Sequence, residues 1–218
     1  QVVVFDDEVE KREDKMGWGL FFHPDLIRNT SLGLKIQEYT FFNYDINEAL
    51  HLSDKEKQNL YDCMVKIESE LNENVDDYSQ SVIVSTIELF LNYCTRYYGR
   101  QFITRKAVNS DLLTKTENII QEHFRRNSEN TMLSVKSLAE KVHLSPNYLG
   151  DLLKKETGMN AQELIHYHLI EYAKTALLNT NQTINEIAYS FGFEYPQYFS
   201  KLFKQKTGHS PVEFRNLN

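Results

Sequence analysis

Apolar residues recur at helical spacing in the middle of the N-terminal half of the chain. The first apolar stripe consists of Leu60, Met64, Ile67 and Leu71. Ser53 and Glu56 stand before it with the spacing of a capping box, which marks the start of a helix. A second stripe runs from Val82 to Tyr97 and stops before Gly99, where a left-handed helix end is expected. A short polar connection separates the two stripes, so the pattern predicts an antiparallel helical hairpin.

The residues before this hairpin have a different pattern. Two short apolar runs, residues 2–5 and 17–22, are rich in the β-branched and aromatic residues that favour strands. Pro24 follows the second run and would end it, because proline cannot donate to a strand ladder. We therefore predict two short strands at this end of the chain. Because the sequence starts with Gln1 and a strand-like run follows at once, we expect it to begin inside a domain.

The C-terminal half contains an internal repeat, with an offset of 49 residues that grows to 50. The first copy contains Leu138-Ala139, Val142, Leu144, Tyr148-Leu149, Leu152-Leu153-Lys154 and Thr157-Gly158. The matching residues of the second copy are Ile187-Ala188, Phe191, Phe193, Tyr198-Phe199, Leu202-Phe203-Lys204 and Thr207-Gly208. The change of offset falls between the two matched blocks, where a loop can absorb one residue. The repeat therefore predicts one supersecondary unit that occurs twice.

Each copy has the pattern of a helix-turn-helix motif, over residues 134–157 and 183–207. A small alanine stands in each copy where two helices must approach closely. The turn that follows requires a positive φ, which Gly192 adopts freely and His143 adopts with some strain. The helix ends carry matching signals: Ser145 before a proline, capping boxes that begin at Asn160 and Thr183, and terminal glycines at positions 158 and 208.

A single long helix is predicted between the two motifs, over residues 161–179. At 1.5 Å per residue this helix would span about 30 Å. One turn of B-form DNA rises by about 34 Å. A rigid helix of that length could therefore hold two reading helices in successive major grooves on one side of a duplex.

Charge and composition neither support nor exclude a nucleic-acid partner. The net charge is −7, but residues 109–218 carry twelve acidic and twelve basic side chains, so the excess acidity lies in residues 1–108. Hydrophobic residues make up 41% of the chain, which is enough for packed cores. No apolar run approaches the ~20 residues that span a bilayer. Cys63 and Cys94 have neither metal-site nor redox-motif spacing, which indicates reduced thiols in a cytoplasmic protein.

Several stretches together carry a family resemblance. In the second copy they are Ile184-Asn185-Glu186-Ile187-Ala188, Gly192-Phe193, Tyr198-Phe199-Ser200-Lys201-Leu202-Phe203-Lys204 and residues 207–215. In the first copy they are Ser145-Pro146-Asn147-Tyr148-Leu149 and residues 152–158. By these residues the chain resembles the AraC/XylS family of bacterial transcription regulators. Residues 21–27 are also similar to the region that follows the effector-binding barrel in that family.

The resemblance implies a mainly α fold. A tandem helix-turn-helix domain of about seven helices, residues 112–218, would follow a linker at residues 101–111. Residues 1–100 would be the end of an effector-binding and dimerisation domain, with a short β remnant of a cupin-like barrel before the helical hairpin. The function implied is activation or repression of nearby promoters.

The predicted DNA contacts lie on the second helix of each motif. The candidate base-reading residues are Asn147, Asp151, Tyr195, Gln197 and Lys201. The candidate phosphate-binding residues are Ser145, Lys154, Lys155, Ser200 and Lys204. Lysine suits guanine and glutamine suits adenine, whereas lysines near the ends of these helices bind phosphate. Asp151 stands where the family commonly has an arginine, so it is either a cytosine reader or an ordinary surface acid, and the second copy would carry most of the specificity.

The predicted partners are double-stranded DNA, a small-molecule effector, RNA polymerase, and a second copy of the chain bound through residues 53–99. No membrane, metal or cofactor is expected, and no residues have the spacing of a catalytic site, which favours a cytoplasmic protein that is not an enzyme. Two alternatives stay open. One is a helix-turn-helix protein-interaction module whose neutral charge supports little or no DNA binding, and the other is an enzyme with a DNA-binding tail.

Overall fold

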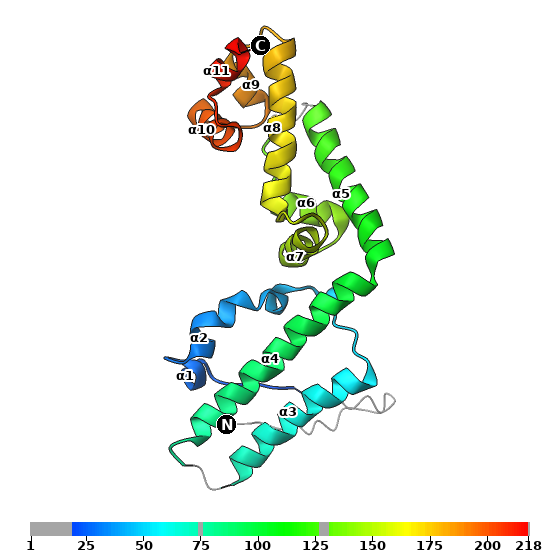
Figure 1. Ribbon diagram of the computed structural model, residues 1–218, viewed down its shortest axis with the longest axis vertical. Helices are drawn as coiled ribbons and strands as arrows, with labels where there is room; N and C mark the ends of the chain where they lie inside the picture. The colour runs from blue at the N-terminus through cyan, green and yellow to red at the C-terminus, as the bar shows by residue number, and fades with distance from the viewer. Residues whose placement is uncertain (1–18, 74–75, 127–130, 218) are drawn as a thin grey trace, which may run out of the picture. The chain divides into compact units, whose positions relative to one another are not determined.

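The protein is helical throughout the part that the computed structural model describes, which is residues 19–73, 76–126 and 131–217 (Figure 1). Its contacts divide the chain into two compact units. The first comprises Gln1–Phe42 and Leu50–Gln101, and the second comprises Asn43–Ala49 and Phe102–Asn218. The short segment Asn43–Ala49 therefore packs with the C-terminal unit although both of its neighbours in sequence belong to the first.

The helical hairpin of the first unit is confirmed. Helix α3 (Asp54–Asn72) and helix α4 (Ser79–Thr104) run antiparallel. Near one end of the pair, the amide of Asn59 donates to the hydroxyl of Tyr97 at 2.8 Å. The capping box at Ser53 is present as predicted.

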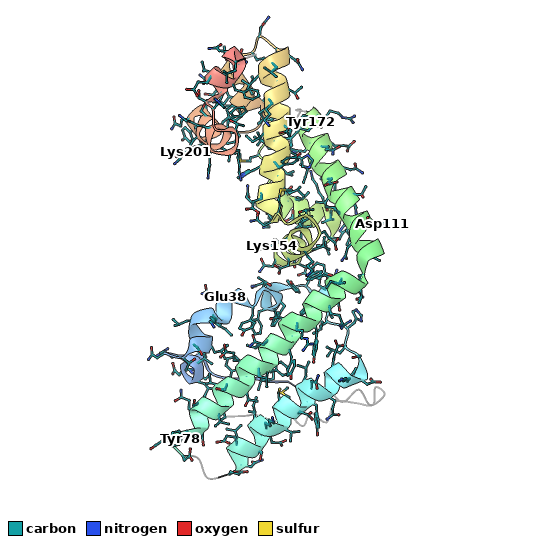
Figure 2. All side chains as sticks on the ribbon, viewed as in Figure 1. Glu38, Tyr78, Asp111, Lys154, Tyr172 and Lys201 are labelled. Carbon is teal, nitrogen blue, oxygen red and sulfur yellow. The ribbon has the colours of Figure 1, made fainter. Side chains whose placement is uncertain are left out.

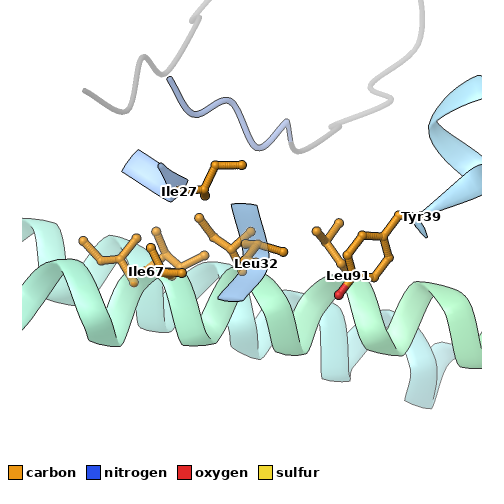
Figure 3. Packing of buried hydrophobic residues seen from close by; sticks show 8 residues of the cluster. Ile27, Leu32, Tyr39, Ile67 and Leu91 are labelled. Atoms are coloured by element: carbon orange, nitrogen blue, oxygen red, sulfur yellow. The ribbon is translucent and has the colours of Figure 1, made fainter. Parts of the chain in front are cut away.

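The core of the first unit lies between this hairpin and a cover of short helices. Helices α1 (Pro24–Ile27) and α2 (Ser31–Lys35) are followed by 3-10 turns at Ile36–Glu38 and Thr40–Asn43. The buried cluster, shown in Figure 3, consists of Ile27, Leu32, Tyr39, Ile67, Ile83, Val84, Ile87 and Leu91. Both cysteines are free and buried. Burial raises the pKa of the Cys94 thiol to about 11, so this thiol is protonated at neutral pH.

The strands predicted near the N-terminus are not found where the structure can test them. Gly19–Phe22, the described part of the second apolar run, has no strand, and the first run, residues 2–5, lies outside the described residues. The side chains of Leu20 and Phe22 pack against the helical core cluster instead. Their burial satisfies the apolar pattern without a strand partner, so a cupin-like barrel remnant has no support in residues 19–22.

The predicted helix end at Gly99 is wrong, and the residues predicted to form a linker, 101–111, are mostly helical. Helix α4 continues to Thr104, and helix α5 (Lys106–Arg126) begins after Arg105. Gln101 and Phe102 are 2% and 5% exposed, so burial carries the helix past the glycine. The sequence gives no sign of this continuation, because it depends on the tertiary packing of Gln101 and Phe102.

The second unit contains the tandem domain of seven helices. After α5 come α6 (Val135–Val142), α7 (Pro146–Thr157), α8 (Ala161–Asn179), α9 (Ile184–Ser190), α10 (Pro196–Thr207) and α11 (Pro211–Asn216). The pair α6–α7 lies by the first turns of α8, and α9, α10 and α11 lie along its later turns (Figure 1). The bounds of α8 agree with the predicted helix, and its 19 residues span about 28 Å.

The two motifs share one backbone design. The amide of Leu144 donates to the carbonyl of Ala139 at 3.0 Å, and the equivalent bond joins Phe193 to Ala188, also at 3.0 Å. Both alanines have no exposed surface, so the close helix approach is confirmed. The predicted left-handed positions are confirmed as well, with φ of 61° at His143 and of 77°, 82° and 83° at glycines 158, 192 and 208.

Candidate nucleic-acid interface

The candidate interface consists of the two recognition helices, α7 and α10, each the second helix of its motif. Both begin with a proline in the first turn and end at a left-handed glycine. Their last turns carry lysines, Lys154 and Lys155 on α7 and Lys204 and Lys206 on α10. Cations at a helix C-terminus are favoured by the helix dipole. Lys154 and Lys201 mark the two helices at separate positions along α8 (Figure 2).

Helix α10 presents most of its predicted contact residues to solvent. Gln197, Lys201 and Lys204 are exposed, and Ser200 is half-buried. Tyr195, the residue that precedes the helix, is 50% exposed. Its ring and the ring of Tyr198 form a T-shaped pair with centroids 5.9 Å apart. The surface of this helix therefore offers an amide, two ammonium groups and a phenol, which are all groups that hydrogen-bond to base edges or phosphates.

Helix α7 presents a smaller part of its predicted set. Lys154 and Lys155 are exposed, but Asn147 and Asp151 are half-buried. Ser145, which caps the helix by accepting a hydrogen bond from the amide of Tyr148 at 3.2 Å, is only 4% exposed. The structure thus brings the predicted residues of the first motif together on one helix, but something else covers its N-terminal end.

The cover is the short segment Asn43–Ala49, which contains a 3-10 turn at Ile46–Glu48. The buried carboxylate of Glu48 accepts hydrogen bonds from the amide and from the hydroxyl of Ser145, both at 2.6 Å. The same carboxylate accepts from the amide of Asp45 at 2.7 Å, which closes a capping box. Sequence reasoning missed this contact, because the Asp45–Glu48 spacing indicates a helical turn but not the partner that lies 97 residues away.

An aromatic contact holds the same segment to α7. The hydroxyl of Tyr44 donates to the carboxylate of Asp151 at 2.7 Å, and its ring meets the ring of Tyr148 at 5.1 Å. Phe102 packs on Tyr148 as well, with ring centroids 5.0 Å apart. Tyr148 is consequently 5% exposed, whereas Tyr198, the equivalent residue of the second motif, is 60% exposed. The two motifs therefore share a backbone but differ in what covers them.

The imidazole of His166, on α8, adds no positive charge to this region at neutral pH. Burial lowers the pKa of His166, and the nearby ammonium of Lys206 lowers it further. Its ring nitrogen lies 2.7 Å from the side-chain nitrogen of Gln162. The positive side-chain charges on α7 and α10 are those of their exposed lysines.

The C-terminal domain is similar to domains of known proteins. A family model described as a helix-turn-helix domain matches residues 138–217. YijO of Escherichia coli strain K12, described as an uncharacterized HTH-type transcriptional regulator, is 30% identical over 125 residues, which are 57% of this chain and 42% of that protein. AdaA of Bacillus subtilis strain 168, a bifunctional transcriptional activator and DNA repair enzyme, is 37% identical over 86 residues, or 39% of this chain and 41% of AdaA.

A solved structure, the C-terminal domain of AraT, a response regulator from Geobacillus stearothermophilus, is 33% identical to this chain. The match covers 49% of this chain and 85% of the AraT domain, with a TM-score of 0.44. The chain spans about two fifths of the length of the curated relatives named above. The family match begins within α6 and ends after α11, so it includes both turns and both recognition helices. Over residues 138–217 the chain therefore contains a helix-turn-helix domain, and this domain is similar to those of transcription regulators, as the resemblance to the AraC/XylS family predicts.

Proposed function

We propose that this chain is a sequence-specific DNA-binding transcription regulator whose two recognition helices enter successive major grooves of one duplex. The observation that carries the proposal is the equivalence of the two motifs, which share the same turn hydrogen bond at opposite ends of one helix. That helix, α8, spans about 28 Å, close to the ~34 Å rise of one DNA turn. The relatives that are named as transcription regulators support the regulatory role.

Within this proposal the exposed side chains of α10 read bases and the lysines at the helix ends hold phosphates. Gln197 would pair with adenine and Lys201 with guanine, since their groups match those base edges. Lys154, Lys155 and Lys204 would bind phosphate, which fixes position without reading sequence. Asp151 would add little to base reading for as long as its carboxylate accepts the hydrogen bond from the hydroxyl of Tyr44.

A selection experiment with the full chain tests the proposal. Duplexes that bind would be enriched from a random pool and measured by fluorescence anisotropy. We expect two half-sites about 10 base pairs apart, because recognition helices in successive major grooves are separated by one helical turn. If no sequence binds better than competitor DNA at moderate salt, the protein-interaction alternative is favoured.

Replacement of Lys201 by alanine should weaken binding to the selected duplex by about 1–3 kcal/mol and relax the preference at one base position. The reason is that an exposed ammonium on α10 would donate directly to a base edge. Anisotropy titrations against a panel of single-base variants measure both effects. An equal loss on selected and scrambled duplexes would contradict base reading by this residue.

Lys154→Ala provides the matched control, because it removes the same group from the end of the other recognition helix. A phosphate contact there should weaken all sequences alike and reduce the salt dependence of log K by about one counterion. An unchanged salt slope would count against phosphate binding at Lys154.

We infer further that the first unit dimerises through its helical hairpin. Its outer surface exposes apolar side chains, namely Tyr61, Val65, Val82 and Leu89, which are 40–45% exposed. Burial of such apolar side chains against a second copy would stabilise the dimer. Light scattering should give twice the mass of one chain at micromolar concentration, and Val65→Asp should shift the mass toward one chain. A mass that stays at one chain across concentrations would remove this inference.

Effector control and contact with RNA polymerase stay predictions that rest on the family. The proposal also assigns the protein to the cytoplasm, where bacterial DNA lies, and among the described helices none is both long and apolar enough to cross a membrane. The enzyme alternative draws on one observation, the bifunctional description of AdaA. We favour binding as the activity of this chain, because the side chains exposed on its recognition helices are of the types that hydrogen-bond to bases and phosphates.

A further inference from the structure

The segment Asn43–Ala49 occupies the end of α7 that a DNA phosphate would use. Glu48 is 3% exposed, and one of its oxygens accepts from the amide of Ser145 while the other accepts from its hydroxyl. Backbone amides and hydroxyls at a helix N-terminus are the groups that bind phosphate oxygens in proteins. A glutamate carboxylate offers two anionic oxygens in place of two phosphate oxygens. Ser145 cannot donate the same two hydrogens to Glu48 and to DNA.

The second anchor of the segment covers the face of α7 that would meet the bases. Tyr44 lies over Tyr148 and donates to Asp151, one turn further along the helix. The equivalent positions of α10 are Tyr198 and Lys201, and both are exposed. The repeat thus contains its own comparison, in which one recognition helix is covered and the other is open.

We propose that residues 43–49 form an inhibitory clasp, in which Glu48 stands in for a DNA phosphate at the N-terminus of the first recognition helix. The clasp must leave α7 before the first motif can bind DNA, while the second motif stays free to bind. The chain before Asn43 and after Ala49 belongs to the first unit. A rearrangement of that unit therefore acts on the clasp through the polypeptide itself. This inference rests on the proposed DNA-binding function and specifies how it is regulated.

The release of the clasp can be tested with substitutions in the full chain. Glu48→Gln keeps the size of the side chain but removes the charge that strengthens its hydrogen bonds. We expect it to bind a duplex with both half-sites about tenfold more tightly than the unchanged protein, as the loss of one charge-assisted bond would allow. Tyr44→Phe removes the bond to Asp151 without any change of charge, and we expect a rise of about threefold.

A charge-matched control separates release of the clasp from general electrostatic attraction. Glu140→Gln removes the same charge from an exposed position on α6 of the same motif. Its affinity for the two-site duplex should rise less than twofold. On a duplex whose first half-site is scrambled, Glu48→Gln should bind like the unchanged protein. An equal gain for Glu48→Gln and Glu140→Gln, or a gain that survives the scrambling, would overturn the clasp.

Hydrogen exchange of the unchanged protein gives a second test that needs no substitution. Peptides that contain residues 43–49 should exchange faster when the two-site duplex is bound, and should not change with a duplex that has only the second half-site. If these peptides stay protected while the first half-site is occupied, the segment is a structural support of α7 and the proposal is wrong. If neither the unchanged protein nor any variant binds DNA, the proposed function fails first, and the clasp fails with it. If all of them bind alike, the clasp alone fails.

Discussion

Gly192→Ala should destabilise the second helix-turn-helix motif by about 2–5 kcal/mol. Gly192 has a φ of 82°, a conformation that costs an alanine about 1–2 kcal/mol. A Cβ at this position would also lie 2.3 Å from the backbone nitrogen of Met132 and from the carbonyl carbon of Thr131. Neither backbone atom can move without displacing the chain, and forced overlap of this kind costs about 1–3 kcal/mol more. Hydrogen exchange of peptides from α9 and α10 measures the change in this motif directly.

The control for this prediction is Gly158→Ala. Gly158 has a similar φ of 77°, but no atom lies within 4 Å of the place its Cβ would take. It should therefore show only the conformational cost, about 1–2 kcal/mol, in the exchange of α7 peptides. Equal losses at the two glycines would mean that the close approach of residues 131–132 is unimportant. If the loss of stability is larger at Gly192, the difference between the two losses is the cost of placing a Cβ against residues 131–132.

Features of the fold that depend on nearby residues could be predicted from the sequence. The capping boxes at Asn160 and Thr183 and the left-handed ends at residues 158 and 208 are held by hydrogen bonds that span three or four residues. Such bonds leave a local pattern of residue types. The repeat added one long-range constraint, because two similar sequences form similar structures. From these signals together, the two helix-turn-helix motifs of the second unit and the long helix between them could be predicted.

Features that depend on distant residues could not be predicted in this way. Gly99 carried a helix-end signal, but burial of Phe102 continues the helix beyond it. The apolar run that ends at Phe22 suggested a strand, but its side chains are taken up by a helical core. In both places tertiary packing outweighs local propensity.

The candidate site shows the same division. The exposure of Gln197 and Lys201 on α10 follows from the helical period, since they lie opposite the buried side of that helix. The burial of Ser145 does not, because it depends on Glu48, which is 97 residues away in sequence. A lone acidic residue in a short segment carries no pattern that identifies its partner. The difference between the two recognition helices is therefore visible only in the structure.

Phe199→Ala should destabilise the second motif by about 3–5 kcal/mol, the range for loss of a buried phenylalanine. Phe199 has no exposed surface, and its ring lies 5.5 Å from that of Phe193, 5.8 Å from that of Phe203 and 6.3 Å from that of Phe191. These rings join α9, the turn and α10, so an alanine leaves a cavity at the centre of the motif. Urea titration followed by hydrogen exchange of α9 and α10 peptides should show the loss there, with α3 and α4 unchanged.

The neighbouring residue supplies the control and connects stability with binding. Tyr198 precedes Phe199 but is 60% exposed, so Tyr198→Ala should change the stability of the motif by less than about 1 kcal/mol. Both substitutions remove an aromatic ring from α10, but only Phe199→Ala should also loosen α9 and the turn. In DNA binding, Phe199→Ala should abolish the preference for the second half-site, because the helix that reads it is no longer held. If the two variants lose equal stability, the buried ring cluster does not organise this recognition helix, and the positions of Gln197 and Lys201 need another support.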